Sequence, residues 1–457
     1  MGRLSSALAV FVCGFLIVGS VGALAKAGPG KVDRDFGKRG LVVQPGPWAP
    51  DGPYGPYGED MAVGPEDAIF LLQSYRSCAR ETCSAELYVQ RYTPDGVLDT
   101  SFGENGSSSK FTVATLPTEG RFYGAGLYGS LAVNPRGEPV VAATNGGDVT
   151  LLRFDRSGEP AGDFGGGDGV VTTDFGADVA KPQLAVSREG RIVVATEFWR
   201  VPEDGRAVIL TRYTPEGDLD PSFGAGTPES TSAGWLAIKG SGPSAFTLSR
   251  GGGIVLAGRR CCSSANPFSA YVGRRKPDGR LLAPYTSSSP WRYLKVGTNA
   301  RVRSVVALPK GKIYLVGNSS KGLFAARILA SGRLDPTFGR AGVVRLKWMA
   351  VGVSPALADR AGRLYLAGRR SNGEAYMASR ALVARLTRDG RLDRRWGHDP
   401  EGYAPLPGRI SDALAMEFQS SGRIVVFGEY SGDCVRTCPL PARILTRLFT
   451  GPASRSR

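Results

Sequence analysis

Arginine and aspartate recur in this chain at one fixed spacing, and these are the residue types that first suggest chemistry. The aspartate stands eight residues after the arginine in four pairs: Arg91 and Asp99, Arg212 and Asp220, Arg327 and Asp335, and Arg385 and Asp393. A guanidinium and a carboxylate form strong bidentate pairs when a turn brings them together. A ring of ligand-binding arginines is the alternative. We favour a structural pair that pins each hairpin, because a ligand site usually breaks the symmetry of a repeat.

Each pair spans a tight turn between two short strands. In the copy at 212–224, Pro215 fits the second position of a β-turn and Gly217 the position where φ is positive. The preceding run at 207–210 is apolar, rich in β-branched residues and too short for a helix. The unit therefore predicts two antiparallel strands joined by a turn.

The same unit returns along the whole chain. Seven arginines mark it, and an aromatic residue follows eleven positions after each of the first six; the arginines are Arg91, Arg153, Arg212, Arg274, Arg327, Arg385 and Arg447, and the aromatics Phe102, Phe164, Phe223, Tyr285, Phe338 and Trp396. A further aromatic, Phe36, stands near the N-terminus, while the one that would follow Arg447 falls one position past the last residue. The two ends of the chain thus carry complementary halves of one unit.

A second hairpin lies between successive units, so each period holds four short strands. Four-stranded units repeated seven times predict a seven-bladed β-propeller, an all-β fold of antiparallel blades. We expect one propeller over residues 31–449, with its ring closed by pairing of the N-terminal strand 40–43 with 443–449 in the last blade, and a disordered tail at 450–457.

The repeat resembles the delta-60 repeat of secreted bacterial β-propeller proteins. The resemblance rests on the Leu-Asp-x-x-Phe-Gly signature at 98–103, 219–224 and 334–339, and on the Arg-Tyr-x-Pro-Asp-Gly-type turn before it. Two units depart from it, since Ala161 replaces the aspartate in the second and Leu282 stands there in the fourth. The resemblance implies an exported propeller and implies no activity, so function must be argued from sites.

The N-terminus has the features of a secretory signal. Arg3 precedes an apolar run at 7–18, and the small residues at 23–25 suit cleavage, which predicts a signal peptide over 1–25 and a secreted protein; an uncleaved anchor is the alternative. The formal net charge of the chain is +16. A secreted basic protein meets anionic glycan or cell-wall polymer more readily than nucleic acid. We expect no nucleic-acid partner, no membrane span after cleavage and a monomer.

Six cysteines remain after the signal, in the close pairs Cys78 and Cys83, Cys261 and Cys262, and Cys434 and Cys438. Because cysteines of exported proteins usually form disulfides, we expect a disulfide within each close pair. Exchange of disulfide partners between the first and last blades is an alternative, and free thiols are the alternative for the adjacent Cys261 and Cys262. Metal binding is not expected, because no pair is Cys-x-x-Cys and His398 is the only histidine. No cofactor fingerprint is present.

Candidate binding residues lie on the long, irregular connections, which share the face opposite the regular turns. Aromatic and arginine side chains there suit an anionic ligand through stacking and bidentate pairing. These residues are Trp48, Tyr54, Tyr57, Trp199, Arg200, Arg259, Arg260, Arg369 and Arg370. Solvated loop tips are the alternative interpretation.

The sequence favours a non-catalytic binding or scaffolding module for an extracellular glycan, polymer or protein. The alternative is a polysaccharide hydrolase or lyase with carboxylates in the central channel, because propeller glycosidases place them on different blades. No catalytic residue is assigned. Facing carboxylates in a deep channel pocket would favour the enzyme, and an apolar plug the binding module.

Overall fold

The computed structural model describes residues 28–44, 57–78, 82–117, 128–144, 147–176, 179, 182–198, 207–232, 234–239, 243–259, 270–285, 290–346, 349–350, 355–370, 380–407, 410–430 and 443–451. The expected signal peptide lies outside these residues. Among the residues so described, no helix has the length and hydropathy that a membrane span requires.

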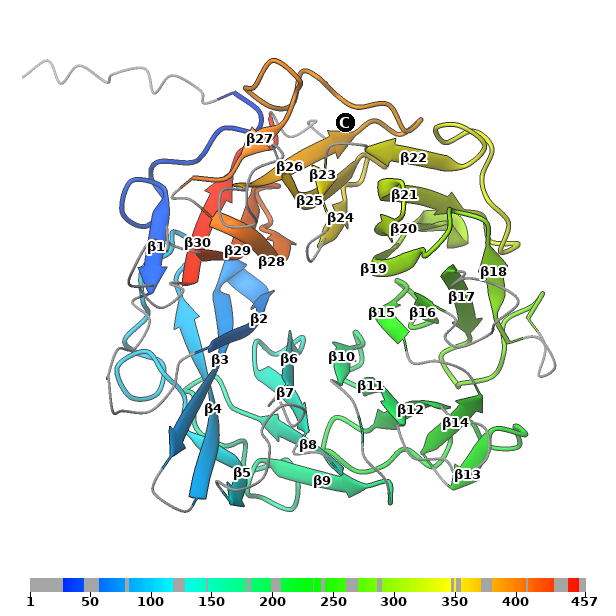
Figure 1. Cartoon of the computed structure of the whole chain (residues 1–457). Coiled ribbons are helices and arrows are strands. Elements are labelled where there is room, and N and C mark those ends of the chain that lie inside the picture. The colour runs from blue at the N-terminus through cyan, green and yellow to red at the C-terminus, as the bar shows by residue number, and fades with distance from the viewer. Residues whose placement is uncertain are drawn as a thin grey trace, which may run out of the picture.

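Seven antiparallel sheets stand around a common centre, so the protein is an all-β, seven-bladed propeller (Figure 1). Blade one comprises β2 (Tyr57–Val63), β3 (Ile69–Cys78), β4 (Thr82–Tyr92) and β5 (Phe111–Pro117), and blade two β6 (Tyr128–Val133), β7 (Pro139–Thr144), β8 (Asp148–Arg153) and β9 (Val170–Asp174). Blade three comprises β10 (Gln183–Val186), β11 (Ile192–Phe198), β12 (Ala207–Tyr213), β14 (Trp235–Lys239) and the added β13 (Ser230–Ser232). Blade four comprises β15 (Pro243–Leu248), β16 (Ile254–Arg259), β17 (Ala270–Arg275) and β18 (Arg292–Leu294).

Blade five comprises β19 (Arg301–Ala307), β20 (Ile313–Ser319), β21 (Gly322–Ile328) and β22 (Val343–Leu346). In blade six, β23 (Met349–Ala350) and β24 (Ala356–Ala358) share the innermost position beside β25 (Leu364–Arg370), followed by β26 (Arg380–Leu386) and β27 (Ala404–Pro405). Blade seven comprises β28 (Ile410–Phe418), β29 (Ile424–Tyr430), β30 (Arg443–Leu448) and β1 (Leu41–Gln44). Short 3-10 turns link the first strand to the second within blade one, at Pro65–Asp67, and within blade five, at Pro309–Gly311.

The N-terminal strand completes the last blade. β1 pairs antiparallel with β30, with Leu41 opposite Thr446, and the two strands lie side by side in Figure 1. The guanidinium of Arg447 binds Asp33 at 2.7 Å and lies over the ring of Phe36, 5.1 Å from its centroid. The aromatic residue missing after Arg447 is thus supplied from the N-terminus.

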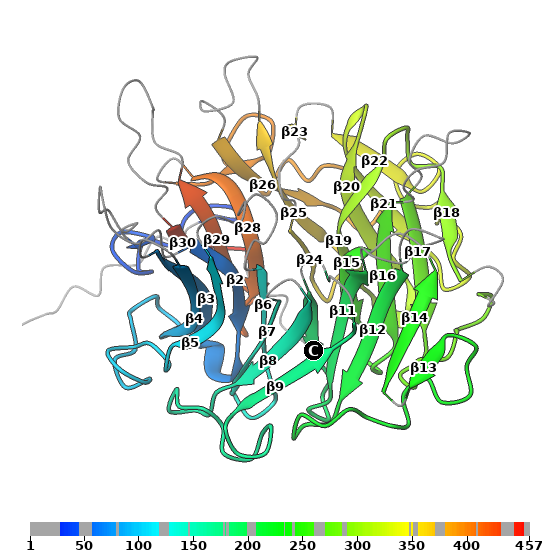
Figure 2. The ribbon, with the colours of Figure 1, turned by 60° about the horizontal axis from the view of Figure 1, so that its bottom comes forward.

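The regular β-turns of every blade lie on one side of the ring. One set joins the first two strands, as at 187–191, and the other follows the third strand, as at 214–218. We call this side the turn face and the opposite side, which carries the links between the second and third strands, the connection face. Figure 2 shows strands of blades three and four running side by side between the two faces.

Neighbouring blades interlock through an aromatic residue and a glycine. The repeat aromatics, among them Phe164 and Trp396, are fully buried. A Cβ on Gly217 of blade three would stand 2.9 Å from the ring of Phe164 in blade two, and φ at Gly217 is +99°. The position therefore requires glycine for two reasons, a positive φ and the close approach of the preceding blade.

The repeat arginines connect each blade to the next. In blade three the Nε of Arg212 donates to Asp220 at 2.9 Å, and one Nη donates to the carbonyl of Pro277 in blade four. All seven arginines donate such a bond to a carbonyl in the following blade: to Arg156, Pro215, Pro277, Ala330, Arg388, Thr450 and Pro94 in turn. The last bond, from Arg447 to Pro94, runs from blade seven to blade one and closes the ring.

Two details differ from the sequence interpretation. In blade two, where Ala161 replaces the aspartate, Arg153 pairs instead with Asp163 and with Glu138 at 3.6 Å. Thr450, which the prediction assigned to a disordered tail, accepts the bond from Arg385 and donates to the carbonyl of Gly422 at 2.6 Å. Thr450, just past the predicted end of the propeller, thus supplies the acceptor for the arginine of blade six.

Candidate functional site

The arginine–aspartate pairs lie on the turn face and act within the scaffold. Arg91, Arg212, Arg327 and Arg385 each bind the aspartate eight residues on, at 2.7–2.9 Å. Each arginine also lies over an aromatic ring of its own blade, as Arg212 does over Phe223 at 4.8 Å. Each of these guanidinium groups is thus engaged by groups of the protein itself.

Most of the expected binding residues and cysteines lie outside the described part of the chain. These are Trp48, Tyr54, Trp199, Arg200, Arg260, Cys261, Cys262, Cys434 and Cys438. Of others, the backbone alone is described: Tyr57 begins β2, Arg370 ends β25, and Cys78 and Cys83 face each other across β3 and β4. His398 is exposed on its turn.

Two expected binding residues, Arg259 and Arg369, are fully described and have different surroundings. They occupy the same place in blades four and six, five residues into the second strand. Arg369, expected in a loop, lies within β25 with 4% of its surface exposed and forms a bidentate pair with Asp412 of blade seven. Its guanidinium stabilises a blade boundary, because the neighbouring inner strand offers a carboxylate.

At the boundary of blades four and five the equivalent partner is an arginine. Asp412 pairs in register with Glu429, which stands five positions after the first residue of β29. Arg301 pairs in the same way with Asn318, five positions after the first residue of β20. Arg301 therefore holds in blade five the register position that Asp412 holds in blade seven. Burial, together with repulsion from Arg301 and Arg259, lowers the pKa of the adjacent Arg303. We call Arg259, Arg301 and Arg303 the arginine cluster.

The arginine cluster adjoins a central cavity of about 440 Å³. Its lining comes mainly from the inner strands of blades one to five and seven, with Glu197 from the second strand of blade three, which places it near the ring axis. The polar side chains that line it are Asp60, Ser130, Gln183, Glu197, Ser244 and Arg303. The cavity is therefore polar and carries both signs of charge, which is unlike an apolar plug.

Several of these polar groups also hold neighbouring blades together. Asp60 accepts hydrogen bonds from the backbone N–H of Leu131 at 3.0 Å and from the hydroxyl of Ser130 at 3.2 Å, both in blade two. Gln183 donates to the carbonyl of Pro243 at 2.7 Å, and Ser244 to that of Val302 at 2.6 Å. These bonds fix the side chains in place, so the cavity is preorganised.

Glu417 is a further carboxyl group, close enough to Asp60 for the two to repel each other. It lies near the end of β28 and is half-buried. Burial, and then repulsion from Asp60, raises the pKa of Glu417 to about 7. A carboxyl group with such a pKa holds its proton near neutral pH and is suited to acid–base chemistry.

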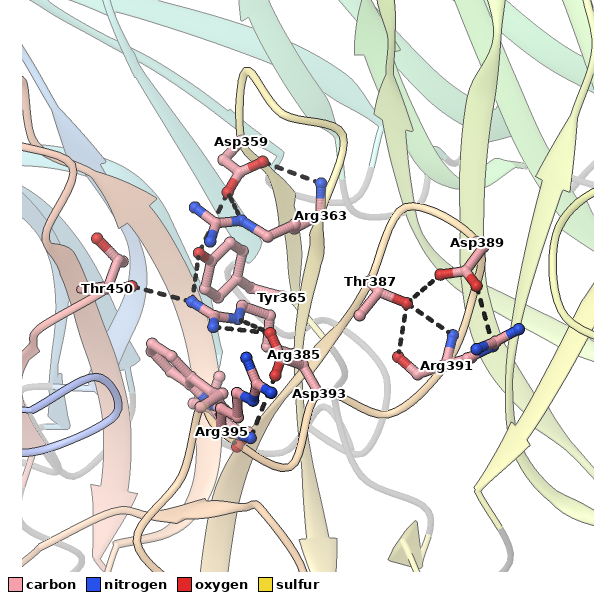
Figure 3. Close-up of polar contacts among 12 residues, drawn as sticks. Asp359, Arg363, Tyr365, Arg385, Thr387, Asp389, Arg391, Asp393, Arg395 and Thr450 are labelled. Atoms are coloured by element: carbon pink, nitrogen blue, oxygen red, sulfur yellow. Dashed lines mark hydrogen bonds and ion pairs between the residues drawn. The ribbon is translucent and has the colours of Figure 1, made fainter. Parts of the chain in front are cut away.

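A second cavity, of about 310 Å³, lies on the turn face between blades six and seven. Figure 3 shows its polar groups bound to one another. Asp359 accepts from Arg363 at 2.6 Å and from the hydroxyl of Tyr365 at 3.2 Å, while Arg385 reaches Thr450 at 2.9 Å. Because these polar groups bind one another, and Arg385 is one of the repeat arginines that join the blades, this recess is part of the scaffold.

Comparison with known proteins supports a propeller repeat family. A protein-family model described as "Domain of unknown function (DUF5122) beta-propeller" matches residues 84–102 and 190–223. These segments hold the repeat pairs of blades one and three, and the match does not extend to the delta-60 repeat in particular. No curated protein sequence matches the chain.

Solved structures show likeness of fold only. A protein of unknown function from Dyadobacter fermentans is 13% identical over 89% of this chain and 98% of its own, with a TM-score of 0.41. An alpha-L-arabinanase from Penicillium chrysogenum, solved with arabinobiose, is 13% identical over 72% and 93%, with a TM-score of 0.40. The β-propeller domain of the Trilobed protease from Pyrococcus furiosus is 10% identical over 78% and 98%, with a TM-score of 0.34. At these values the likenesses carry no argument about function.

Proposed function

We propose that the protein binds an acidic extracellular polysaccharide or cell-wall polymer through the arginine cluster and the central cavity. The observation that carries the proposal is that Arg303 lines the cavity and is repelled by both Arg301 and Arg259, so three arginines gather beside it. Three guanidinium groups that repel one another bind a polyanion favourably, because the anion relieves the repulsion and guanidinium forks match carboxylate or phosphate oxygens.

The remaining polar groups of the cavity suit a saccharide. Asp60 and Glu197 accept hydrogen bonds from sugar hydroxyls, and Arg303 on the other side of the cavity takes an anionic substituent. The net charge of +16 raises the local concentration of a polyanion and speeds its association. Secretion, a monomeric state and a cell-surface partner are parts of this proposal.

Binding of acidic and neutral polysaccharides at low and high salt tests this function. We expect retention of the acidic polymers alone, weaker at high salt because exposed charges are screened. If neutral polymers bind equally well, or if no acidic polymer binds at low salt, the proposal fails.

Glu417 favours one second function, hydrolysis of the bound polysaccharide. A carboxyl group with a pKa of about 7 near a second carboxyl group, Asp60, resembles the pair of carboxyl groups of a glycosidase. Reducing-end release from the bound polymers tests it, with Glu417→Gln expected to abolish release and to leave binding intact. Binding without release would leave the protein a binding module.

A further inference from the structure

Blade four lacks the carboxylate that neutralises the repeat arginine elsewhere. In five blades the Nε of the arginine donates to an aspartate; the aspartates are Asp33, Asp99, Asp220, Asp335 and Asp393. Leu282 occupies this position in blade four, and its backbone N–H bonds to the carbonyl of Arg274 as the aspartates do to theirs. The main chain is thus conserved between the blades while the charge is missing.

Arg274 is nevertheless buried. It is 5% exposed, and one Nη donates to the carbonyl of Ala330 at 3.1 Å. Among the described residues its Nε has no hydrogen-bond partner and no carboxylate pairs with it. A guanidinium does not lose its proton in proteins, and an unpaired buried charge is strongly unfavourable.

Two other substitutions place further donors around Arg274. The repeat aromatic is Tyr285, 4% exposed, whose hydroxyl has no hydrogen-bond partner among the described residues. In four other blades an aliphatic side chain packs beside the repeat aromatic and the turn glycine of the next blade; these side chains are Val42, Val171, Leu236 and Val344. Arg292 occupies the same position in blade four. Its Nε also lacks a partner within the described chain.

The three side chains converge at the boundary with blade five. Both guanidinium groups act electrostatically on the Tyr285 hydroxyl, and Arg292 lies 5.9 Å from the centroid of that ring. A Cβ on Gly332 would stand 2.9 Å from the hydroxyl, so the backbone of blade five covers the site. Each guanidinium donates to one backbone carbonyl, Arg274 to Ala330 and Arg292 to Pro284. The two Nε groups and the Tyr285 hydroxyl are left without an acceptor among the described residues.

We propose that blade four binds an external carboxylate, such as that of a small organic acid, in the place of the missing aspartate. In blade three, Asp220 accepts from Arg212 and Ser222 and lies 3.7 Å from a second cation, Arg191. The bound carboxylate takes corresponding bonds from the Nε of Arg274 and the hydroxyl of Tyr285, and Arg292 is the second cation. The site is separate from the central cavity, and the proposal does not depend on the proposed function.

Thermal unfolding and calorimetric titration of the full chain with acetate, glucuronate, chloride and sulfate at constant ionic strength test this site. We expect acetate to raise the Tm saturably, because a ligand bound only to the folded state stabilises it, and chloride and sulfate to do less. A response to glucuronate as well would show that the site admits a sugar acid, and a response to acetate alone that it admits a small acid only.

Leu282→Asp is the decisive variant, since it restores the aspartate of the other blades. We expect a higher Tm without acetate and loss of the acetate response. Tyr285→Phe should keep the fold and weaken acetate binding about tenfold, as for one hydrogen bond to a charged group. Asp220→Leu is the control, because blade three has Phe223 in place of the tyrosine and Leu236 in place of Arg292, and acetate should not restore its Tm.

Three results would overturn the site. They are an equal Tm response of the wild type to acetate, chloride and sulfate, an acetate response retained in Leu282→Asp, and unchanged acetate affinity in Tyr285→Phe.

Discussion

Replacing Arg212 with alanine is expected to destabilise the whole ring. The guanidinium binds Asp220 at 2.9 Å and Ser222 at 2.8 Å within blade three, and the carbonyl of Pro277 in blade four. Only 5% of the Arg212 side chain and 8% of the Asp220 side chain are exposed. The substitution therefore leaves the buried carboxylate with only the more distant Arg191, at 3.7 Å, and removes one of the seven arginine–carbonyl bonds between blades.

The magnitude follows from this burial. Removing one partner of a buried ion pair costs about 3–5 kcal/mol. The unfolding entropy of about 2.1 cal/mol/K per residue gives roughly 1 kcal/mol/K for 457 residues. If the ring unfolds cooperatively, we expect the Tm to fall by about 3–5 °C.

Differential scanning calorimetry measures this change, with Arg333→Ala as the matched control. Arg333 is an exposed arginine on a turn of the same face, so its removal should leave the Tm within about 0.5 °C, as for an ordinary surface substitution. The double variant Arg212→Ala, Asp220→Ala should recover part of the loss, because no carboxylate is then buried alone. An unchanged melting curve for Arg212→Ala would refute the structural role of the repeat arginines.

Three further predictions concern single positions. Gly217→Ala should lower the Tm, measured by calorimetry, because φ is +99° and the new Cβ would meet the preceding blade at under 3 Å. Burial and then repulsion from Asp174 raise the pKa of Asp148, so ionisation of Asp148 lowers the stability as the pH rises through that pKa. Urea unfolding should therefore show that Asp148→Asn is more stable than the wild type at pH 7 and not at pH 3. The raised pKa of Glu417 likewise contributes stability at low pH that is lost as the pH rises from 4.5 to about 7, so Glu417→Gln should remove this loss over that range, and an unchanged pH profile would contradict the raised pKa.

The fold could be predicted from the sequence because its signals are local and repeated. Arginine, glycine and an aromatic residue keep their spacing in successive units, and each position has a physical role in one hairpin. Spacing alone did not show that Gly217 packs on Phe164 of the preceding blade, or that Arg212 reaches Pro277 in the next. Those contacts depend on how one blade rotates against another.

The candidate site could be predicted only in part. Arg259 was expected to bind because it follows a strand near exposed loops, whereas Arg369, in the same place, is paired with Asp412. The difference lies in the inner strand of the next blade, where one chain segment offers Asp412 and another Arg301. Polar residues on the inner strands, such as Asp60 and Arg303, could have pointed to the cavity from the sequence, because the inner strand of each blade lies next to the ring axis.

The most direct test of the central claim compares two double variants that remove the same charge from opposite faces. Arg301→Gln, Arg303→Gln removes two arginines of the cluster, and Arg333→Gln, Arg388→Gln removes two exposed arginines of the turn face. Affinity for an acidic oligosaccharide is measured by titration calorimetry at one salt concentration. We predict that the first variant loses at least about tenfold in affinity and that the second binds as the wild type does. Equal losses in the two variants would show that binding follows net charge and not the cavity, and would contradict the account.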